Sequence, residues 1–132
     1  MSVTIATKTD LSGTITPIGL STETTVVAPG AQADDYIVEG YVDLSNMQLG
    51  DTVVLTEYVS LDGSTYLQLN QATFTGAQSG GANPPVQHFT SKTLFATVAG
   101  TKGANLYKVT VNQTGGTVRA FNFSFGVQVM SG

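Results

Sequence analysis

The stretch that decides the fold runs from Leu106 to Met130 and reads LYKVTVNQTGGTVRAFNFSFGVQVM. Its first part, residues 106–113, alternates apolar and polar side chains, and residues 118–130 alternate again after a Gly115-Gly116 turn. The apolar positions of the second part are Phe121, Phe123, Phe125, Val127 and Val129. Such period-two alternation is typical of antiparallel strands with one face on a core. The stretch therefore predicts an antiparallel hairpin that packs one face on the core.

The chain before this stretch also divides into short strands. Residues 36–43 and 52–61 are rich in β-branched and aromatic residues, and Asp62-Gly63 is a hairpin signal before a return strand at 65–75. Residues 76–85 contain glycine and proline without charge and predict a long exposed loop. No segment carries a helical stripe. About eight to ten short strands predict an all-β, antiparallel two-sheet sandwich with jelly-roll-like or Ig-like connections, whose strand order the sequence leaves open.

The connection at residues 44–51 carries three apolar side chains between two predicted strands. We expect Leu44, Met47 and Leu49 to plug one end of the sandwich, with Gly50-Asp51 turning the chain back.

The first 33 residues differ from the rest because their aliphatic side chains are sparse and Pro17, Gly19 and Pro29 interrupt them. They predict either edge strands or an extended N-terminal arm, followed by a sandwich domain at residues 34–132. An arm with free backbone groups can add to the sheet of a neighbouring subunit. The candidate subunit-contact residues are Val3, Ile5, Ile15, Ile18 and Leu20.

Charge and composition exclude several classes of partner. Charged residues make up 11% of the chain, the net charge is −4, and the five basic residues are scattered singly. Binding to phosphates or to an anionic membrane surface needs clustered lysine and arginine, so we expect neither nucleic acid nor membrane as a partner. The chain has no cysteine, and its start lacks the apolar run of a signal peptide. Both features fit assembly in a cytoplasm.

The sequence offers little catalytic chemistry. His88 is the sole histidine, so a hydrolytic triad or a histidine-rich metal site is not expected. Asp34-Asp35 lacks the rest of a calcium loop, and the other carboxylates show no paired spacing. We therefore expect no enzyme activity, no cofactor and no metal. Exposed tyrosines would allow glycan binding, and the candidates are Tyr36, Tyr41, Tyr58, Tyr66 and Tyr107.

Two segments, Tyr41–Leu55 and Tyr107–Phe121, resemble small virion proteins of tailed bacteriophages and related viruses. In those proteins a strand leads into Asp-Leu-Ser and Gly-Asp-Thr-Val, and a terminal hairpin carries Tyr-Lys-Val-Thr. The resemblance covers residues 36–125 and leaves the N-terminal segment and the 76–85 loop without a counterpart. It implies a virion protein that decorates or cements a capsid, with capsid protein or its own copies as partners and a trimer as the favoured oligomer. The alternative is a glycan-binding β-sandwich module, either fibre-borne or non-viral.

Overall fold

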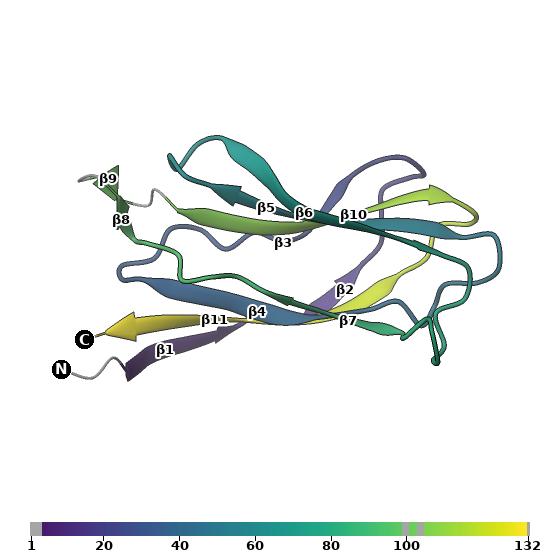
Figure 1. The fold of residues 1–132 in the computed structure, drawn as a ribbon, viewed down its shortest axis with the longest axis horizontal. Coiled ribbons are helices and arrows are strands. Elements are labelled where there is room, and N and C mark those ends of the chain that lie inside the picture. Colours follow the sequence, from purple (N-terminus) through teal and green to yellow (C-terminus); the bar gives the residue numbers. More distant parts are fainter. Residues whose placement is uncertain (1–3, 99–100, 103–104, 132) are drawn as a thin grey trace.

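The computed structural model describes residues 4–98, 101–102 and 105–131, and its regular elements are all β-strands. Two antiparallel sheets pack face to face (Figure 1). The β4 sheet comprises β1 (Thr4–Asp10), β2 (Gly13–Ile15), β4 (Tyr36–Asp43), β7 (Val86–Thr90) and β11 (Phe121–Ser131). The β5 sheet comprises β3 (Thr24–Val27), β5 (Thr52–Ser60), β6 (Tyr66–Thr75) and β10 (Leu106–Gly115). The short strands β8 (Thr97–Val98) and β9 (Thr101–Lys102) pair with each other. The prediction of an all-β, two-sheet sandwich is confirmed.

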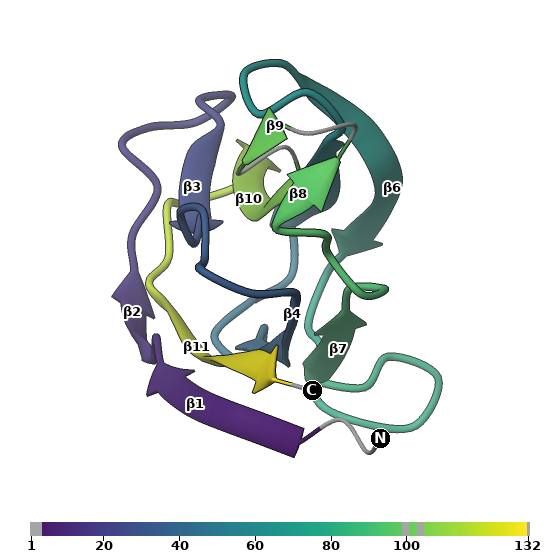
Figure 2. The same ribbon diagram turned by 90° about the vertical axis from the view of Figure 1, so that its left-hand side faces the viewer.

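The strand order identifies the sandwich as a jelly roll. The β4 sheet has the order β1-β11-β4-β7, with β2 also paired to β11, and the β5 sheet has the order β3-β10-β5-β6. Without the short strands β2, β8 and β9, eight strands remain, and the chain changes sheet at every step except the β5–β6 hairpin, as in two interlocked Greek keys. Figure 2 shows the two layers end-on, with β1, β11, β4 and β7 opposite β3, β10 and β6.

The predicted hairpin at residues 106–130 is wrong in its pairing, although both of its strands exist. β10 pairs with β3 and β5, whereas β11 pairs with β1, β2 and β4 in the opposite sheet. The reason is that alternation shows only that a strand has one core-facing side. Two neighbours in one sheet and two strands that face each other across the core produce the same pattern. The segment after Gly115 is therefore a crossover between sheets.

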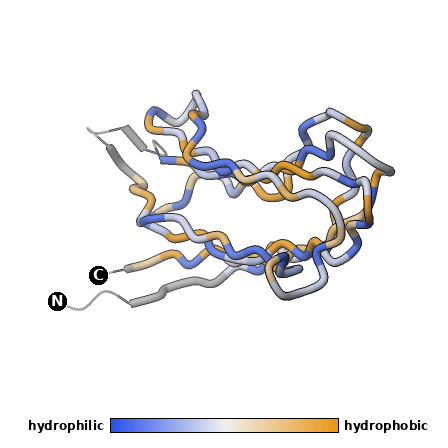
Figure 3. The backbone as a smooth tube through the Cα atoms, turned by 45° about the vertical axis from the view of Figure 1, so that its right-hand side comes forward, coloured by the Kyte–Doolittle hydropathy of each residue, from blue (hydrophilic) through white to orange (hydrophobic). Residues whose placement is uncertain are grey.

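The alternation itself places the core correctly. Phe121, Phe125, Val127 and Val129 of β11 are buried, and Phe123 is half-buried against the core. Hydrophobic and hydrophilic residues alternate along the strands of both layers (Figure 3). The fully buried large side chains come from both sheets and include Tyr36, Val38, Val42, Val53, Leu55, Tyr107, Val109, Val111 and Phe121.

The Phe125 ring requires a glycine on the neighbouring strand. Gly40 pairs with Phe125, and a Cβ at Gly40 would lie 2.6 Å from Phe125 Cγ and 2.2 Å from the Ser124 carbonyl oxygen. Contacts this short do not occur in folded proteins, so any side chain at residue 40 would displace β11.

The predicted plug is correct for two of its three residues. Leu44 and Met47 are buried, but Leu49 is 94% exposed. The Asp51 N–H donates to the Gln48 carbonyl oxygen, and the Gln48 N–H donates to Asp51 Oδ2. These two bonds close a tight turn with Gly50 at a φ of 93°. Leu49 lies at the tip of this turn and points away from the core.

The N-terminal segment supplies edge strands within its own chain. β1 and β2 both lie along β11, and β3 lies along β10. Leu11 and Ile15 pack against the core from this segment. Exchange of the segment between subunits stays a prediction.

Candidate functional site

Four connections gather at one end of the sandwich, at the right in Figure 1, and hydrogen bonds join them. Three bonds run between connections: Leu44 N to Pro85 O (2.7 Å), Asn46 Nδ2 to Ala120 O (2.6 Å) and Gly76 N to Asp51 O (2.9 Å). A fourth bond, from Ser21 N to Gln113 O (2.8 Å), ties the connection before β3 to the end of β10. This end is referred to below as the loop end.

Asp51 is the charged centre of the loop end. Its side chain is 1% exposed, and Oδ2 accepts hydrogen bonds from Arg119 Nε at 2.8 Å and from the Gln48 N–H at 2.9 Å. Oδ1 accepts from the Thr117 N–H at 3.2 Å. Desolvation raises the pKa of Asp51, but the Arg119 guanidinium and the two amides outweigh it and hold the pKa below its ordinary value. The carboxylate therefore stays ionised and fixes the crossover in place.

Gln113 completes this crossover from the other side. Its fully buried amide donates through Nε2 to the carbonyl oxygens of Gly115 and Thr117, and Oε1 accepts from the Arg119 N–H at 3.0 Å. The polar groups of the loop end thus satisfy one another, which is the pattern of a structural network rather than a reactive site.

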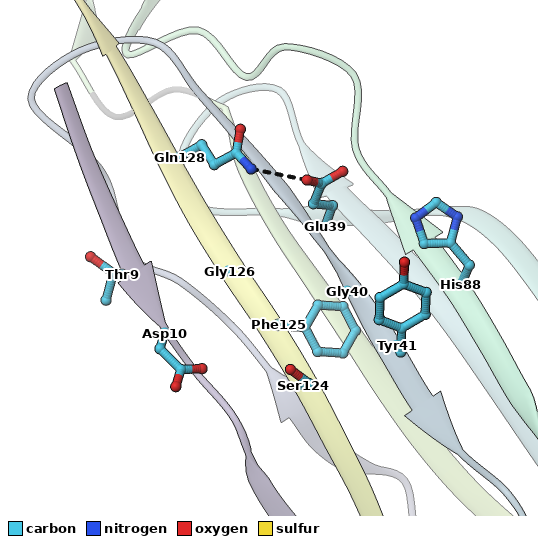
Figure 4. Close-up of a pocket in the computed structure, with 10 residues that line it drawn as sticks. All are labelled: Thr9, Asp10, Glu39, Gly40, Tyr41, His88, Ser124, Phe125, Gly126 and Gln128. Carbon is cyan, nitrogen blue, oxygen red and sulfur yellow. Dashed lines mark hydrogen bonds between the residues drawn. The ribbon is translucent and has the colours of Figure 1, made fainter. Parts of the chain in front are cut away.

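A shallow depression of about 360 Å³ lies on the outer face of the β4 sheet (Figure 4). Its floor is Gly126 of β11, which pairs with Asp10 of β1 on one side and with Glu39 of β4 on the other. Because opposed residues of antiparallel strands point to the same face, both carboxylates flank a position without a side chain. The depression therefore exists because Gly126 has no side chain to fill this position.

Polar and aromatic groups line the rest of the depression. Gln128 Nε2 donates to Glu39 Oε1 at 2.9 Å, and Ser124 lies beside Gly126 on β11. The rings of Tyr41 and His88 stand 5.1 Å apart and are tilted by 34°. Acceptors beside an exposed aromatic ring can bind a polar ligand rich in hydroxyl groups, or an amine.

His88 lies at the rim of this depression on the edge strand β7, with an exposed side chain. Within the described residues, no hydrogen bond connects it to a carboxylate, and no group of three or more metal-binding side chains is present. The general base of a hydrolytic triad requires an orienting carboxylate partner. The surroundings of His88 do not provide one.

The structure separates the five tyrosine candidates. Tyr36 and Tyr107 are fully buried, where Tyr36 Oη donates to the Asn105 carbonyl and Tyr107 Oη to the Glu57 carboxylate. Burial raises the pKa of Tyr36 to about 12 and also raises that of Tyr107. Neither ring is accessible to a ligand.

Tyr58 and Tyr66 lie on the outer face of the β5 sheet and are half-buried. Lys108 Nζ stands 4.8 Å from the Tyr58 ring centroid and 4.5 Å from that of Tyr66, a cation–π arrangement that covers both rings. Tyr58 Oη also donates to Glu23 Oε2, and this bond contributes most to the lowered pKa of Glu23. Tyr41, at 52% exposure, is therefore the tyrosine left open to a ligand.

The predicted subunit-contact residues fall into three groups. Val3 lies outside the described residues, and Ile5 is placed only through its backbone, which pairs with Met130. Ile15 packs against the core of its own chain. Ile18 and Leu20 are 85% and 46% exposed on the connection before β3 and remain available for contacts.

Sequence reasoning missed other exposed apolar residues, above all Leu67 and Leu69 on β6, at 54% and 56% exposure, and Leu49 at the loop end. One feature of the sequence could have drawn attention to Leu67 and Leu69. They lie in the longest segment without a charged residue, from Gly63 to Ser91.

The comparisons with known proteins show a shared fold. No family model matches the chain, and no curated protein matches it. A solved structure described as "Bacillus endospore appendages form a novel family of disulfide-linked pili" is similar over 97% of this chain and 88% of that chain, with a TM-score of 0.54 and 13% identity. At this identity the similarity shows the β-sandwich fold alone.

Viral structures are also similar in part. The VP2 subviral particle of infectious bursal disease virus matches 98% of this chain with a TM-score of 0.44 and 9% identity. The Gx strain of the same virus gives a TM-score of 0.48 at 9% identity. In both cases the match covers 32% of the viral chain, so this chain spans about a third of their length.

Among the residues that the structure describes, no helix is long and apolar enough to cross a membrane.

Proposed function

We propose that this chain is a non-enzymatic structural subunit that acts through contacts with other proteins, including copies of itself. The observation that carries the proposal is the exposure of large apolar side chains on a sparsely charged protein. They lie on β6 and on the connections at the loop end. They are Leu67 and Leu69 on β6, and Ile18, Leu20 and Leu49 on the connections. Grouped apolar exposure marks protein-interaction surfaces.

The finer proposal is a virion component that decorates or cements a capsid and is assembled in a host cytoplasm. The resemblance of residues 36–125 to small virion proteins supports a capsid surface as the partner. The fold shared with a Bacillus pilus structure supports the wider class, a repeated subunit of an extracellular or virion assembly. That pilus is described as disulfide-linked, whereas this chain has no cysteine. Its contacts would therefore be non-covalent.

The absence of catalysis is part of this proposal. Asp51, the carboxylate with the most polar partners at the loop end, is fully engaged by Arg119 and backbone amides. His88 lies on an exposed edge strand beside Tyr41. Catalysis by either residue would require a free, oriented proton acceptor.

The test is sedimentation of the purified chain alone and after mixing with particles from the organism that encodes it. We expect concentration-dependent association or co-sedimentation with the particles. A chain that stays monomeric at the highest attainable concentration and also stays in the supernatant would overturn the proposal.

The second candidate function is glycan binding at the depression over Gly126. Tyr41 favours it because its ring is exposed and lines the same depression as Asp10, Glu39 and Gln128. A glycan array would test it with Tyr41→Ala and with Phe95→Ala as the control, since Phe95 is a similarly exposed aromatic at 50%. Binding that only Tyr41→Ala abolishes would support this candidate. An array on which the wild-type chain binds nothing would exclude it for the glycans displayed.

A further inference from the structure

The β6 strand forms an open sheet edge with unusual exposure. It is ten residues long, it terminates the order β3-β10-β5-β6, and eight of its residues are exposed. Figure 2 shows β6 along the outer margin of the β5 sheet. Such a strand presents its outward N–H and C=O groups as a template for another strand.

The other edge strands carry features that discourage pairing with a strand of another chain, and β6 has few of these features. β1 contains Lys8 and Asp10, β3 is four residues long and follows Glu23, and β7 is five residues long and follows Pro84-Pro85. Short length, charge and proline are the usual protections of an edge strand. β6 has neither charge nor proline, and its one irregularity is a bulge at Leu69.

We propose that β6 is an interface to a second copy of this chain, formed by antiparallel pairing of the two β6 strands. The inference rests on the proposed structural function and specifies its partner surface. The result is a continuous eight-stranded sheet, four strands from each copy, related by a two-fold axis. This contact is two-fold and therefore differs from the trimer that the family resemblance implies.

Charge favours a second copy as the occupant of this edge. Each chain has a net charge of −4, so two copies repel wherever acidic residues face each other. The segment from Gly63 to Ser91 has no charged residue, and β6 lies within it. Two β6 strands can therefore approach without this repulsion.

The side chains of β6 are also self-complementary. In an antiparallel pair centred on Gln71, with the bulged Leu69 left unpaired on both strands, Leu67 lies opposite Phe74 of the second copy, and Gln71 lies opposite the Gln71 of that copy. Leu67 pairs with Val59 and Phe74 with Val53 inside the chain, so the bulge places both on the core-facing side of β6. Leu67 and Phe74 of the two copies thus meet on the core-facing side, and the two Gln71 amides meet at the centre on the outer face.

The test compares Leu69→Lys with Val86→Lys by sedimentation velocity. Both replace an exposed apolar side chain of an edge strand with lysine, but Val86 lies on β7, at an edge of the other sheet. We expect Leu69→Lys to raise the dimer dissociation constant at least about tenfold, while Val86→Lys leaves it unchanged. Thr73→Lys, also exposed on β6, serves as a second variant if Leu69→Lys does not fold.

Amide hydrogen exchange provides a direct second readout. In the wild-type chain, β6 amides should gain protection as concentration rises, and those of β7 should not. The proposal is overturned if the wild-type chain shows no dimer, if both lysine variants act equally, or if β6 protection is independent of concentration. A chain that lacks this dimer but still sediments with particles would refute the β6 contact and leave the structural function in place.

Discussion

Arg119 Nε lies 2.8 Å from Oδ2 of Asp51, and this ion pair joins two connections that are 68 residues apart in the chain. One connection leads from β4 to β5, and the other carries the chain from the β5 sheet to the β4 sheet. The pair therefore ties the crossover before the last strand to the β4–β5 connection, and this crossover is the feature that the sequence pattern misplaced.

Replacing Asp51 with Asn should destabilise the protein by about 3 kcal/mol near neutral pH. Removing one partner of a buried pair costs about 3–5 kcal/mol, and the lower end applies because Arg119 keeps 31% of its side chain exposed. Chemical denaturation would measure the difference. A loss below about 0.5 kcal/mol, as at an ordinary surface site, would contradict the role assigned to this pair.

The same pair predicts an acid dependence of stability. The folded-state pKa of Asp51 is below its ordinary value of 3.8, so the unfolded state binds the proton more readily. The stabilisation from Asp51 is therefore complete above about pH 4 and is lost as pH falls through the folded pKa. Unfolding curves from pH 7 to pH 2 should show the gap between wild type and Asp51→Asn narrowing below pH 4. A gap that stays constant would show that Asp51 is not the titrating group.

Replacing Gly40 with Ala should cost about 3 kcal/mol or prevent folding, because the new Cβ would lie 2.2 Å from the Ser124 carbonyl oxygen. Gly30→Ala is the matched control, since nothing lies within 4 Å of a Cβ there. Thermal unfolding of both variants would measure the effect. Equal melting temperatures would contradict the register between β4 and β11.

Replacing Phe125 with Ala should cost about 3–5 kcal/mol, because the ring is 2% exposed and its removal leaves a cavity. Phe123→Ala should cost less, since that ring is half-buried. Asn122→Ala, on the exposed face, should stay within about 0.5 kcal/mol. Denaturant titrations of the three variants should give this order of stability losses. A loss for Asn122→Ala as large as that for Phe125→Ala would show that the buried and exposed faces of β11 are assigned the wrong way round.

The sequence predicted the positions of the strands better than the way in which the strands pair. Alternation from Phe121 to Val129 identified the core face of β11 because burial follows the two-residue period of a strand. It could not assign β10 and β11 to different sheets, because alternation is the same for two neighbours in one sheet and for two strands that face each other across the core.

The candidate sites were less accessible to sequence reasoning. The depression brings together Asp10, Glu39 and Gly126 through strand register, and no short motif encodes such a register. The exposure of Leu67 and Leu69 also depends on tertiary structure, because their alternation with polar residues is equally typical of a core-facing strand. Only the position of β6 at the sheet edge leaves them open.

A structural component of a larger protein assembly stays with that assembly through purification. The most direct test of the proposed function is therefore the abundance of the chain in gradient-purified particles or appendages from the organism that encodes it, measured by quantitative mass spectrometry. We expect the chain to co-purify at a fixed ratio to the main structural protein through successive gradients. A chain that is expressed in the same cells but is absent from every assembled fraction would rule out the proposed function.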